Sequence, residues 1–234
     1  MTVMWYNAPR RYACSLIDGK WDMAFWQYIL DNQQKYIGLV LRHIELTLIA
    51  LCISIFLGTA IAVACYRNDR AVDIANTVVS AFRVIPSIAL LLLCMPIMGT
   101  GFLPALFALT ILGLSPVVNN GITSLRGLDP AVLEAANACG MEDRQLFWKV
   151  RWPLAMPGII TGYRMAGLSI SAGATLAAYI GAGGLGELIL SGISQFRYDM
   201  IFAGALTMIL LSLLVEILFQ LIYLRVSRFR LARG

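Results

Sequence analysis

Three ionisable residues lie inside long apolar runs of this 234-residue chain: Arg83, Arg164 and Glu216. A charge in an apolar medium is costly, so such residues are usually paired with an opposite charge or have a function. We therefore first consider ion pairing as the role of these three residues. Three interpretations of Arg83 stay open: it snorkels to an interface, it pairs with an acid, or it faces a water-filled vestibule.

The residue types that commonly bind metals or form disulfides are sparse. No two of the five cysteines have the spacing Cys-x-x-Cys, and three of them lie inside apolar runs, so we interpret them as small packing residues. The single histidine, His43, has no candidate ligand partner nearby and is interpreted as a helix-end or interface residue. The sequence therefore predicts no metal site. The cysteines are Cys14, Cys52, Cys65, Cys94 and Cys139.

Two glycine patterns have both a chemical and a structural interpretation. The run Gly181–Gly186 is similar to a dinucleotide-binding pattern, but that function requires a preceding strand, and here an apolar span precedes it. We therefore expect these glycines to shape a loop and to let helices approach closely. Gly158 and Gly162 form a Gly-x-x-x-Gly pattern that is followed by further small residues, which favours tight helix packing over a pathway wall.

The composition places the chain in a lipid bilayer. Hydrophobic residues make up 59% of it and charged residues only 13%, with a mean hydropathy of +0.77. A soluble domain carries roughly 25% charged residues. The net charge of +5 is attributed to membrane orientation, because no basic cluster is interleaved with aromatic residues that could stack on bases. The chain is thus expected to contact membrane lipids and no nucleic acid.

Uncharged runs predict about five transmembrane helices in a single all-α integral membrane domain. A helix needs about 20 apolar residues to cross the hydrocarbon core. The run 84–125 is too long for one helix, and Met98–Gly101 breaks it between Pro96 and Pro104. The predicted spans are residues 46–66, 74–97, 102–125, 157–179 and 200–224.

The loop charges predict the orientation. Ten lysines and arginines would share one side of the membrane, which is then the cytoplasmic side, with the N-terminus outside. Residues 1–35 are expected to form an extracytoplasmic or interfacial segment, because Trp5, Trp21, Trp26 and Tyr28 suit a helix lying on the membrane. Residues 36–225 form the transmembrane domain and residues 226–234 a basic cytoplasmic tail. The ten residues are Arg67, Arg70, Arg126, Arg144, Lys149, Arg151, Arg225, Arg228, Arg230 and Arg233.

A polar segment over residues 126–153 separates the third and fourth spans. Asp129 and Pro130 suit an N-cap and a first helical residue, and residues 131–139 are strong helix formers. Gly140 then predicts the end of this helix. A second helix is expected from Arg144 to Trp152, ending at Pro153. Such a compact element could dock in a groove of a partner.

The spacing of this segment resembles the EAA loop of permease subunits of bacterial ATP-binding-cassette importers. Glu134-Ala135-Ala136 is followed by Gly140 and then by Val150 and Pro153. Three other stretches are similar to permeases of the osmoprotectant family, which import glycine betaine, carnitine and choline, so that the resemblance covers roughly residues 24–225. These stretches are Ile85–Leu91, Trp152–Pro157 and Ala174–Gly186. The chain differs from the family at Arg83, at Asn119-Asn120 and at Ser169–Ala172.

The resemblance implies a type I importer permease fold with a cytoplasmic EAA coupling loop, in the inner membrane of a bacterium. It implies no enzymatic activity and no cofactor in this chain, since the partner ATPase binds ATP. The implied partners are a second permease subunit (the same chain or a paralogue), two ATPase subunits and an extracytoplasmic substrate-binding protein. The implied coupling residues are Glu134, Ala135, Ala136, Gly140, Val150 and Pro153, and the pathway candidates are Ser87, Asn119, Asn120, Ser169, Ser171 and Thr175.

Other functions stay open at this point. The solute could be an amino acid or a betaine-like metabolite such as ergothioneine. A secondary transporter or channel that works without ATP, and a membrane scaffold without transport, belong to different classes. Five spans and a docking loop argue against the secondary transporter, whose signs are inverted repeats and broken-helix ion sites.

Two of the intramembrane charges are expected to pair with each other. Arg164 lies seven residues past Pro157, and Glu216 lies nine residues before Arg225. At about 1.5 Å per residue, both sit roughly 10–13 Å into the membrane from the cytoplasmic side. Equal depth on consecutive antiparallel helices makes contact feasible, and we predict an ion pair near the cytoplasmic end of the pathway.

Overall fold

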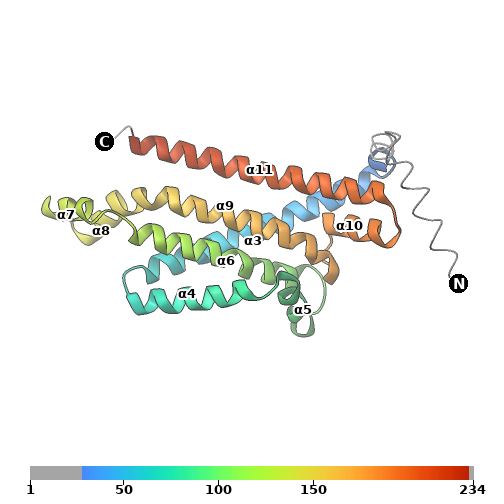
Figure 1. Ribbon diagram of the computed structural model, residues 1–234, viewed down its shortest axis with the longest axis horizontal. Coiled ribbons are helices and arrows are strands. Elements are labelled where there is room, and N and C mark those ends of the chain that lie inside the picture. The colour runs from blue at the N-terminus through green and yellow to red at the C-terminus, as the bar shows by residue number, and fades with distance from the viewer. Residues whose placement is uncertain (1–27, 232–234) are drawn as a thin grey trace.

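The computed structural model describes residues 28–231, and side chains over residues 28–227. Every regular element in this part of the chain is a helix (Figure 1). The α-helices are α3 (Gln33–Cys65), α4 (Asp69–Val84), α5 (Ser87–Met98), α6 (Phe102–Arg126), α7 (Pro130–Ala138), α8 (Asp143–Leu146), α9 (Trp152–Leu176), α10 (Leu185–Ser194) and α11 (Tyr198–Leu231). A π-helix (Phe147–Arg151) joins α8 to α9, and a 3-10 helix (Ala177–Ile180) follows α9.

The long helices α3, α6, α9 and α11 run side by side, and the two ends of this bundle differ (Figure 1). The helices α7 and α8 lie at the same end as the C-terminus, whereas α10 lies at the opposite end. The turn between α5 and α6 is also at the opposite end, because the Gly101 amide donates to the Ile180 carbonyl over 2.7 Å. This arrangement agrees with the predicted topology, in which residues 126–153 and the C-terminal tail share one side.

The described residues contain three helices that are long and apolar enough to cross a membrane singly, namely α3, α6 and α11. The bent pairs α4–α5 and α9–α10 raise the number to as many as five by length and composition. Half of the apolar window of α6 is buried inside the chain, against 11% for α11. The leucines and isoleucines that α11 leaves exposed are therefore suited to contact lipid.

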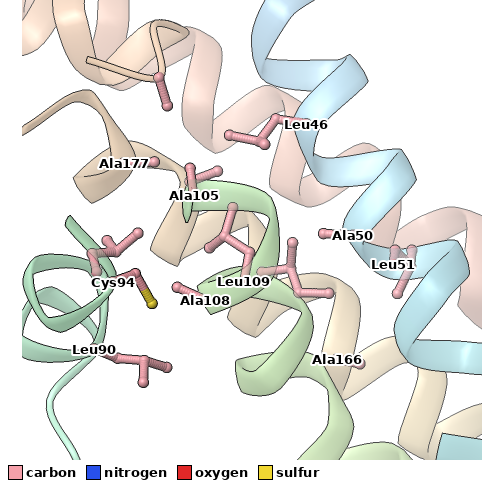
Figure 2. Close-up of a cluster of buried hydrophobic side chains, with 14 of the residues drawn as sticks. Leu46, Ala50, Leu51, Leu90, Cys94, Ala105, Ala108, Leu109, Ala166 and Ala177 are labelled. Carbon is pink, nitrogen blue, oxygen red and sulfur yellow. The ribbon is translucent and has the colours of Figure 1, made fainter. Parts of the chain in front are cut away.

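The core forms around α6, which packs against α3, α4, α5 and α9. Figure 2 shows this cluster, in which Ala105, Ala108 and Leu109 of α6 meet Leu46 and Ala50 of α3. The residues at these contacts are small or aliphatic, so the helix axes come close together. Ser54 adds a polar link between the helices, because its hydroxyl contacts the Thr110 carbonyl at 2.9 Å.

Glycines make the contact between α6 and α9 possible. A Cβ atom added at Gly162 would lie 2.8 Å from the Asn120 Cβ and 2.9 Å from the Pro116 carbonyl oxygen. One added at Gly158 would meet Ser124 at 2.0 Å. The predicted packing role of these two glycines is confirmed, since no side chain fits at either position without displacing α6.

The single span predicted over residues 74–97 is wrong in shape. The structure has two helices there, α4 and α5, with an angle of 94° between them. Pro86 explains the break, because it lacks an amide hydrogen and forces the preceding residue out of the helical region. Ile85 accordingly has φ −70° and ψ 123°, an extended conformation.

The expected loop-shaping role of Gly181–Gly186 is confirmed, and the dinucleotide-binding interpretation that the sequence disfavoured does not fit the structure. A 3-10 helix precedes these glycines and α10 follows them, and residues 28–231 contain no strand. Gly181, Gly183 and Gly184 all have positive φ angles between 75° and 84°, so the loop needs glycine for its conformation. A Cβ at Gly186 would lie 1.9 Å from the Thr175 carbonyl oxygen, so this glycine lets α10 fold back onto α9.

The first helix begins earlier than the apolar run predicts, at Gln33 rather than near residue 46. Lys35, Arg42 and Glu45 lie on its first turns, where an exposed helix end tolerates charge. The predicted interfacial segment with Trp5, Trp21 and Trp26 lies outside the described residues. Tyr28, which was grouped with it, is buried among side chains from α3, α10 and α11.

We predict that Gly162→Ala lowers stability by about 1–3 kcal/mol, because the added methyl group overlaps backbone and Cβ atoms of α6. Gly38→Ala on α3 is the matched control, since nothing lies within 4 Å of its added Cβ. That control should be neutral or slightly stabilising, as alanine is the better helix former. Thermal unfolding of the detergent-solubilised protein measures both, and equal melting temperatures would contradict the packing role.

We predict that reporter fusions at Thr100 and at Asp143 give signals from opposite sides of the membrane. The two residues lie at opposite ends of the helical bundle, in the α5–α6 turn and at the start of α8. An alkaline phosphatase fusion should be active at Thr100 and a cytoplasmic reporter should be active at Asp143. Activity of the same reporter at both positions would rule out this topology.

Candidate functional site

The polar segment between α6 and α9 has the local structure that its sequence predicts. The Asp129 carboxylate accepts a hydrogen bond from the Ala131 amide at 2.9 Å, and Pro130 occupies the first turn of α7. Helix α7 ends at Ala138, and Gly140 follows with φ +77°, the left-handed conformation that favours glycine. The predicted start and stop of this helix are both confirmed.

Most of the predicted coupling residues lie on the surface at one end of the molecule. Glu134, Ala135, Gly140 and Pro153 are exposed, and Val150 is half-buried. Ala136 differs, because it is buried beneath α7. The segment thus presents a small-residue surface with one carboxylate, and Ala136 holds that surface against the rest of the segment.

The sequence predicted that the second helix of this segment ends at Pro153, and this prediction is wrong. The helix continues from Asp143 through the π-helix and α9 as far as Ile180. Pro153 lies in the first turn of α9, a position at which a missing amide hydrogen costs little. The Trp152 amide bonds back to Phe147 with the longer π-helical spacing, so the helical rod passes the proline without a break.

Aromatic and cationic side chains anchor this rod to the ends of α3 and α6. The Arg151 guanidinium donates to the Leu125 carbonyl at 2.7 Å and lies over the Tyr66 ring. The Phe147 ring is 5.8 Å from the Tyr66 ring. Sequence reasoning missed this cluster. Its only signal was the aromatic spacing of Phe147, Trp148 and Trp152, which does not identify a partner ring on α3.

An ion pair adds a second anchor at the same end. Arg67 donates to Asp143 at 3.2 Å, which links the α3–α4 turn to α8. Its hydrogen bond to the Tyr66 hydroxyl raises the pKa of the Arg67 guanidinium above its ordinary value, so this cation persists at any physiological pH. Exposed pairs contribute little to stability. Arg67 therefore orients α8 rather than holding the fold together.

A cavity of about 150 Å³ lies between α4, α6 and α9, farther along the rod. Three of the pathway candidates, Asn119, Asn120 and Ser169, line it, and so does Arg83. The remaining lining residues are Phe82, Ile111, Leu112, Ser115, Pro116 and Met165. The tertiary structure thus brings together Arg83, Asn119-Asn120 and Ser169, which are among the positions where the sequence departs from the pattern of the osmoprotectant permeases.

The other three pathway candidates lie elsewhere. The Ser171 hydroxyl is 3.3 Å from that of Ser212, and Thr175 donates to the Met208 sulfur at 3.4 Å, so both contact α11. Ser87 is half-buried at the start of α5 and does not line this cavity. Polar residues of α9 therefore divide between the cavity and the helix–helix contact with α11.

The predicted ion pair between α9 and α11 is confirmed. Arg164 Nε donates to Glu216 Oε2 at 2.8 Å, and Arg164 Nη1 donates to the Gln220 amide oxygen at 2.8 Å. The side chains of Arg164 and Glu216 retain 36% and 27% of their accessible surface. Each charge in this apolar region thus has a hydrogen-bonded partner, and Gln220, which sequence reasoning missed, adds a neutral acceptor.

Comparisons with known proteins agree on one family. Residues 40–228 match the family described as "Binding-protein-dependent transport system inner membrane component". The carnitine transport permease protein OpuCB of Listeria monocytogenes is 33% identical over 193 residues, which cover 82% of this chain and 88% of the relative. The osmoprotectant import permease protein OsmW of Salmonella typhimurium is 36% identical over 198 residues, covering 81% and 90% respectively.

A solved structure shows the same fold at lower sequence identity. A chain of the MetNI methionine ABC transporter, in an inward-facing conformation, superposes with a TM-score of 0.76 at 20% identity. The match covers 84% of this chain and 98% of that one. This likeness establishes the fold and says nothing of the solute.

We predict that Glu216→Ala lowers the stability of the protein by about 1–3 kcal/mol, because it leaves the Arg164 cation without its partner in an apolar region. The double change Arg164→Met with Glu216→Leu should recover part of the loss, since it removes both charges. Thermal unfolding in detergent measures the effect. If the stability losses of Arg164→Met and of the Glu216 change simply add in the double variant, the two residues are not coupled and the ion pair is contradicted.

Proposed function

Because this chain belongs to the inner membrane components of binding-protein-dependent transport systems, and among them to the osmoprotectant importer permeases, we propose that it forms half of a gated pathway for quaternary-amine osmoprotectants. It is a multi-pass protein of the inner membrane and a subunit of an ATP-driven importer. The family implies a partner permease, an ATPase and a substrate-binding protein.

One observation carries the mechanism: the coupling segment and the cavity share a single helical rod. The rod begins at Asp143, three residues after Gly140, and continues through Met165 and Ser169, which line the cavity. A helix is stiff along its axis, so a displacement applied at α8 moves the cavity wall as well. Because Tyr66 and Leu125 hold the near end of the rod, such a displacement would also shift the ends of α3 and α6.

In this proposal, one of the two ATPase subunits grips this chain on the surface formed by Glu134, Ala135 and Gly140, with Ala136 buried behind it, together with Val150 and Pro153. ATP binds to those subunits and not to this chain. A second permease subunit, either another copy or a paralogue, completes the pathway. The binding protein docks at the opposite end, near α10 and the α5–α6 turn. The pathway wall contributed by this chain consists of Asn119, Asn120, Ser169 and Arg83.

Glycine betaine, carnitine and choline are the proposed solutes, because the relatives at 33% and 36% identity are named for carnitine and for osmoprotectants. Another small solute, such as an amino acid or ergothioneine, is the alternative within the same family. Uptake by the complete importer across these solutes distinguishes them. Uptake of an amino acid but of no trimethylammonium compound would replace the proposed substrate class.

We predict that Gly140→Asp abolishes most solute uptake while the protein stays in the membrane and the ATPase stays active. A side chain at φ +77° costs about 1–2 kcal/mol of backbone strain, and no steric clash adds to that cost because nothing lies within 4 Å of an added Cβ. The added carboxylate would put a new charge on the proposed docking surface, and removing that charge from water on docking would weaken the contact. Uptake and ATP hydrolysis are measured on the same reconstituted complex.

Gly140→Asn is the matched control for that experiment. Asparagine has the same shape as aspartate and tolerates the left-handed conformation, but carries no charge. It should therefore retain more coupling than Gly140→Asp. Normal uptake in Gly140→Asp would contradict the assignment of this surface to the ATPase.

A further inference from the structure

We propose that the cavity between α4, α6 and α9 binds the carboxylate of a zwitterionic trimethylammonium solute, and that Arg83 is a specificity-determining residue. Under this inference, the permease itself prefers betaines over choline, which has a hydroxyl group in place of the carboxylate. The inference rests on the proposed function and narrows its substrate class.

The first support is that Arg83 is a cation without a counter-ion among the described residues. Five other arginines form ion pairs with carboxylates, at both ends of the bundle and between α9 and α11; they are Arg42, Arg67, Arg126, Arg164 and Arg197. No such pair or side-chain hydrogen bond involves Arg83 in the described part of the chain. Its side chain is exposed and lines the cavity, whose lining includes no aspartate or glutamate. The cavity therefore presents a net positive charge.

The second support is a set of neutral polar groups around that cation. Asn119, Asn120 and Ser169 add amide and hydroxyl groups to the lining. The Ser115 hydroxyl is buried and has no hydrogen-bond partner among the described residues. Helical serines usually donate to the carbonyl one turn back, as Ser124 and Ser169 do here. Ser115 thus keeps a donor available at the cavity, which a bound oxyanion would satisfy.

The rest of the lining suits the other end of such a solute. Phe82, Ile111, Leu112 and Met165 supply apolar and aromatic surface. A trimethylammonium group is bulky, carries no hydrogen-bond donor, and is favoured by apolar and aromatic contact. A zwitterion can place its carboxylate at Arg83 and its cationic end against this surface. A plain cation such as choline has no group that offsets the charge of Arg83 and is repelled by it.

Arg83 also lies in the last turn of α4, where a cation interacts favourably with the helix dipole. That interaction would persist with any solute, so it predicts no change in solute preference when Arg83 is replaced. Lysine would preserve the charge and the dipole interaction but not the bidentate geometry that an arginine offers to a carboxylate. These differences allow the two roles of Arg83 to be separated by experiment.

The test compares uptake of glycine betaine and of choline by the complete importer, with its ATPase and binding protein, reconstituted in proteoliposomes. These two solutes share the trimethylammonium group and differ in the carboxylate. The variants are Arg83→Gln, Arg83→Lys and the control Arg70→Gln, which removes an exposed cation from the first turn of the same helix, outside the cavity. Since one binding protein serves every variant, a change in the uptake ratio reports on the permease. Binding of radiolabelled glycine betaine to the permease–ATPase complex without the binding protein provides a second measurement.

We expect Arg83→Gln to lower glycine betaine uptake and binding at least tenfold and to leave choline uptake unchanged or raised. Arg83→Lys should retain part of the preference, and Arg70→Gln all of it. Equal loss of both solutes in Arg83→Gln, or no loss of either, would overturn the inference while the proposed function stands. A wild-type importer that moves no trimethylammonium solute would overturn the proposed function and the inference with it.

Discussion

The close contact between α6 and α9 determines how the other helices are arranged. In a bilayer, helices gain no hydrophobic free energy by associating, so packing of their surfaces has to supply the attraction. Gly158 and Gly162 bring α9 against the backbone of α6, and Gly173 does the same near the other end of the contact, where a Cβ would meet Leu109 at 2.7 Å. Helices α3, α4 and α5 then pack on the remaining surface of α6.

This contact also fixes the relation between the two parts of the candidate site. The coupling segment continues directly into α9, and the cavity lies where α9, α6 and α4 meet. Because the helix continues past Pro153 and Pro157 from Asp143 to Ile180, the far wall of the cavity is joined to the end of the bundle near Gly140 by one continuous helix. The sharp bend at Pro86 lies instead between α4 and α5, just beyond Arg83, so the other cavity wall ends at a junction bent by 94°. One cavity wall is therefore stiff along its length, and the opposite wall ends at a break.

The charged side chains differ in their partners according to where they lie in the bundle. Ion pairs at the ends of the bundle involve exposed side chains and orient local segments, as Arg67 does for α8. Arg164 and Glu216 lie farther in and tie α9 to α11, with Gln220 accepting another guanidinium hydrogen. Arg83 lies apart from these pairs, beside amides and hydroxyls, which is the environment of a group that meets a solute rather than a structural partner.

The sequence by itself determined the features that depend on residues close together in the chain. Runs of apolar residues located the long helices, Asp129 and Gly140 located both ends of α7, and the loop charges separated the two ends of the bundle. The Arg164–Glu216 pair could also be predicted from the sequence, because counting residues places both side chains at equal depth on neighbouring antiparallel helices. The polar segment over residues 126–153 could be located because its helix signals lie within one loop.

Only the tertiary structure decided the features that depend on distant residues. Pro86 lies inside the run predicted as one span, and the 94° angle there depends on how α5 packs against α6. The convergence of Arg83, Asn119 and Ser169 follows from the separation and rotation of three helices, of which α6 and α9 approach closely at Gly158 and Gly162. The contact of Phe147 with Tyr66 has the same origin. Hydropathy and local spacing encode which face of a helix is apolar, but not which helix will cover it, because that choice is made by shape complementarity between surfaces far apart in the sequence.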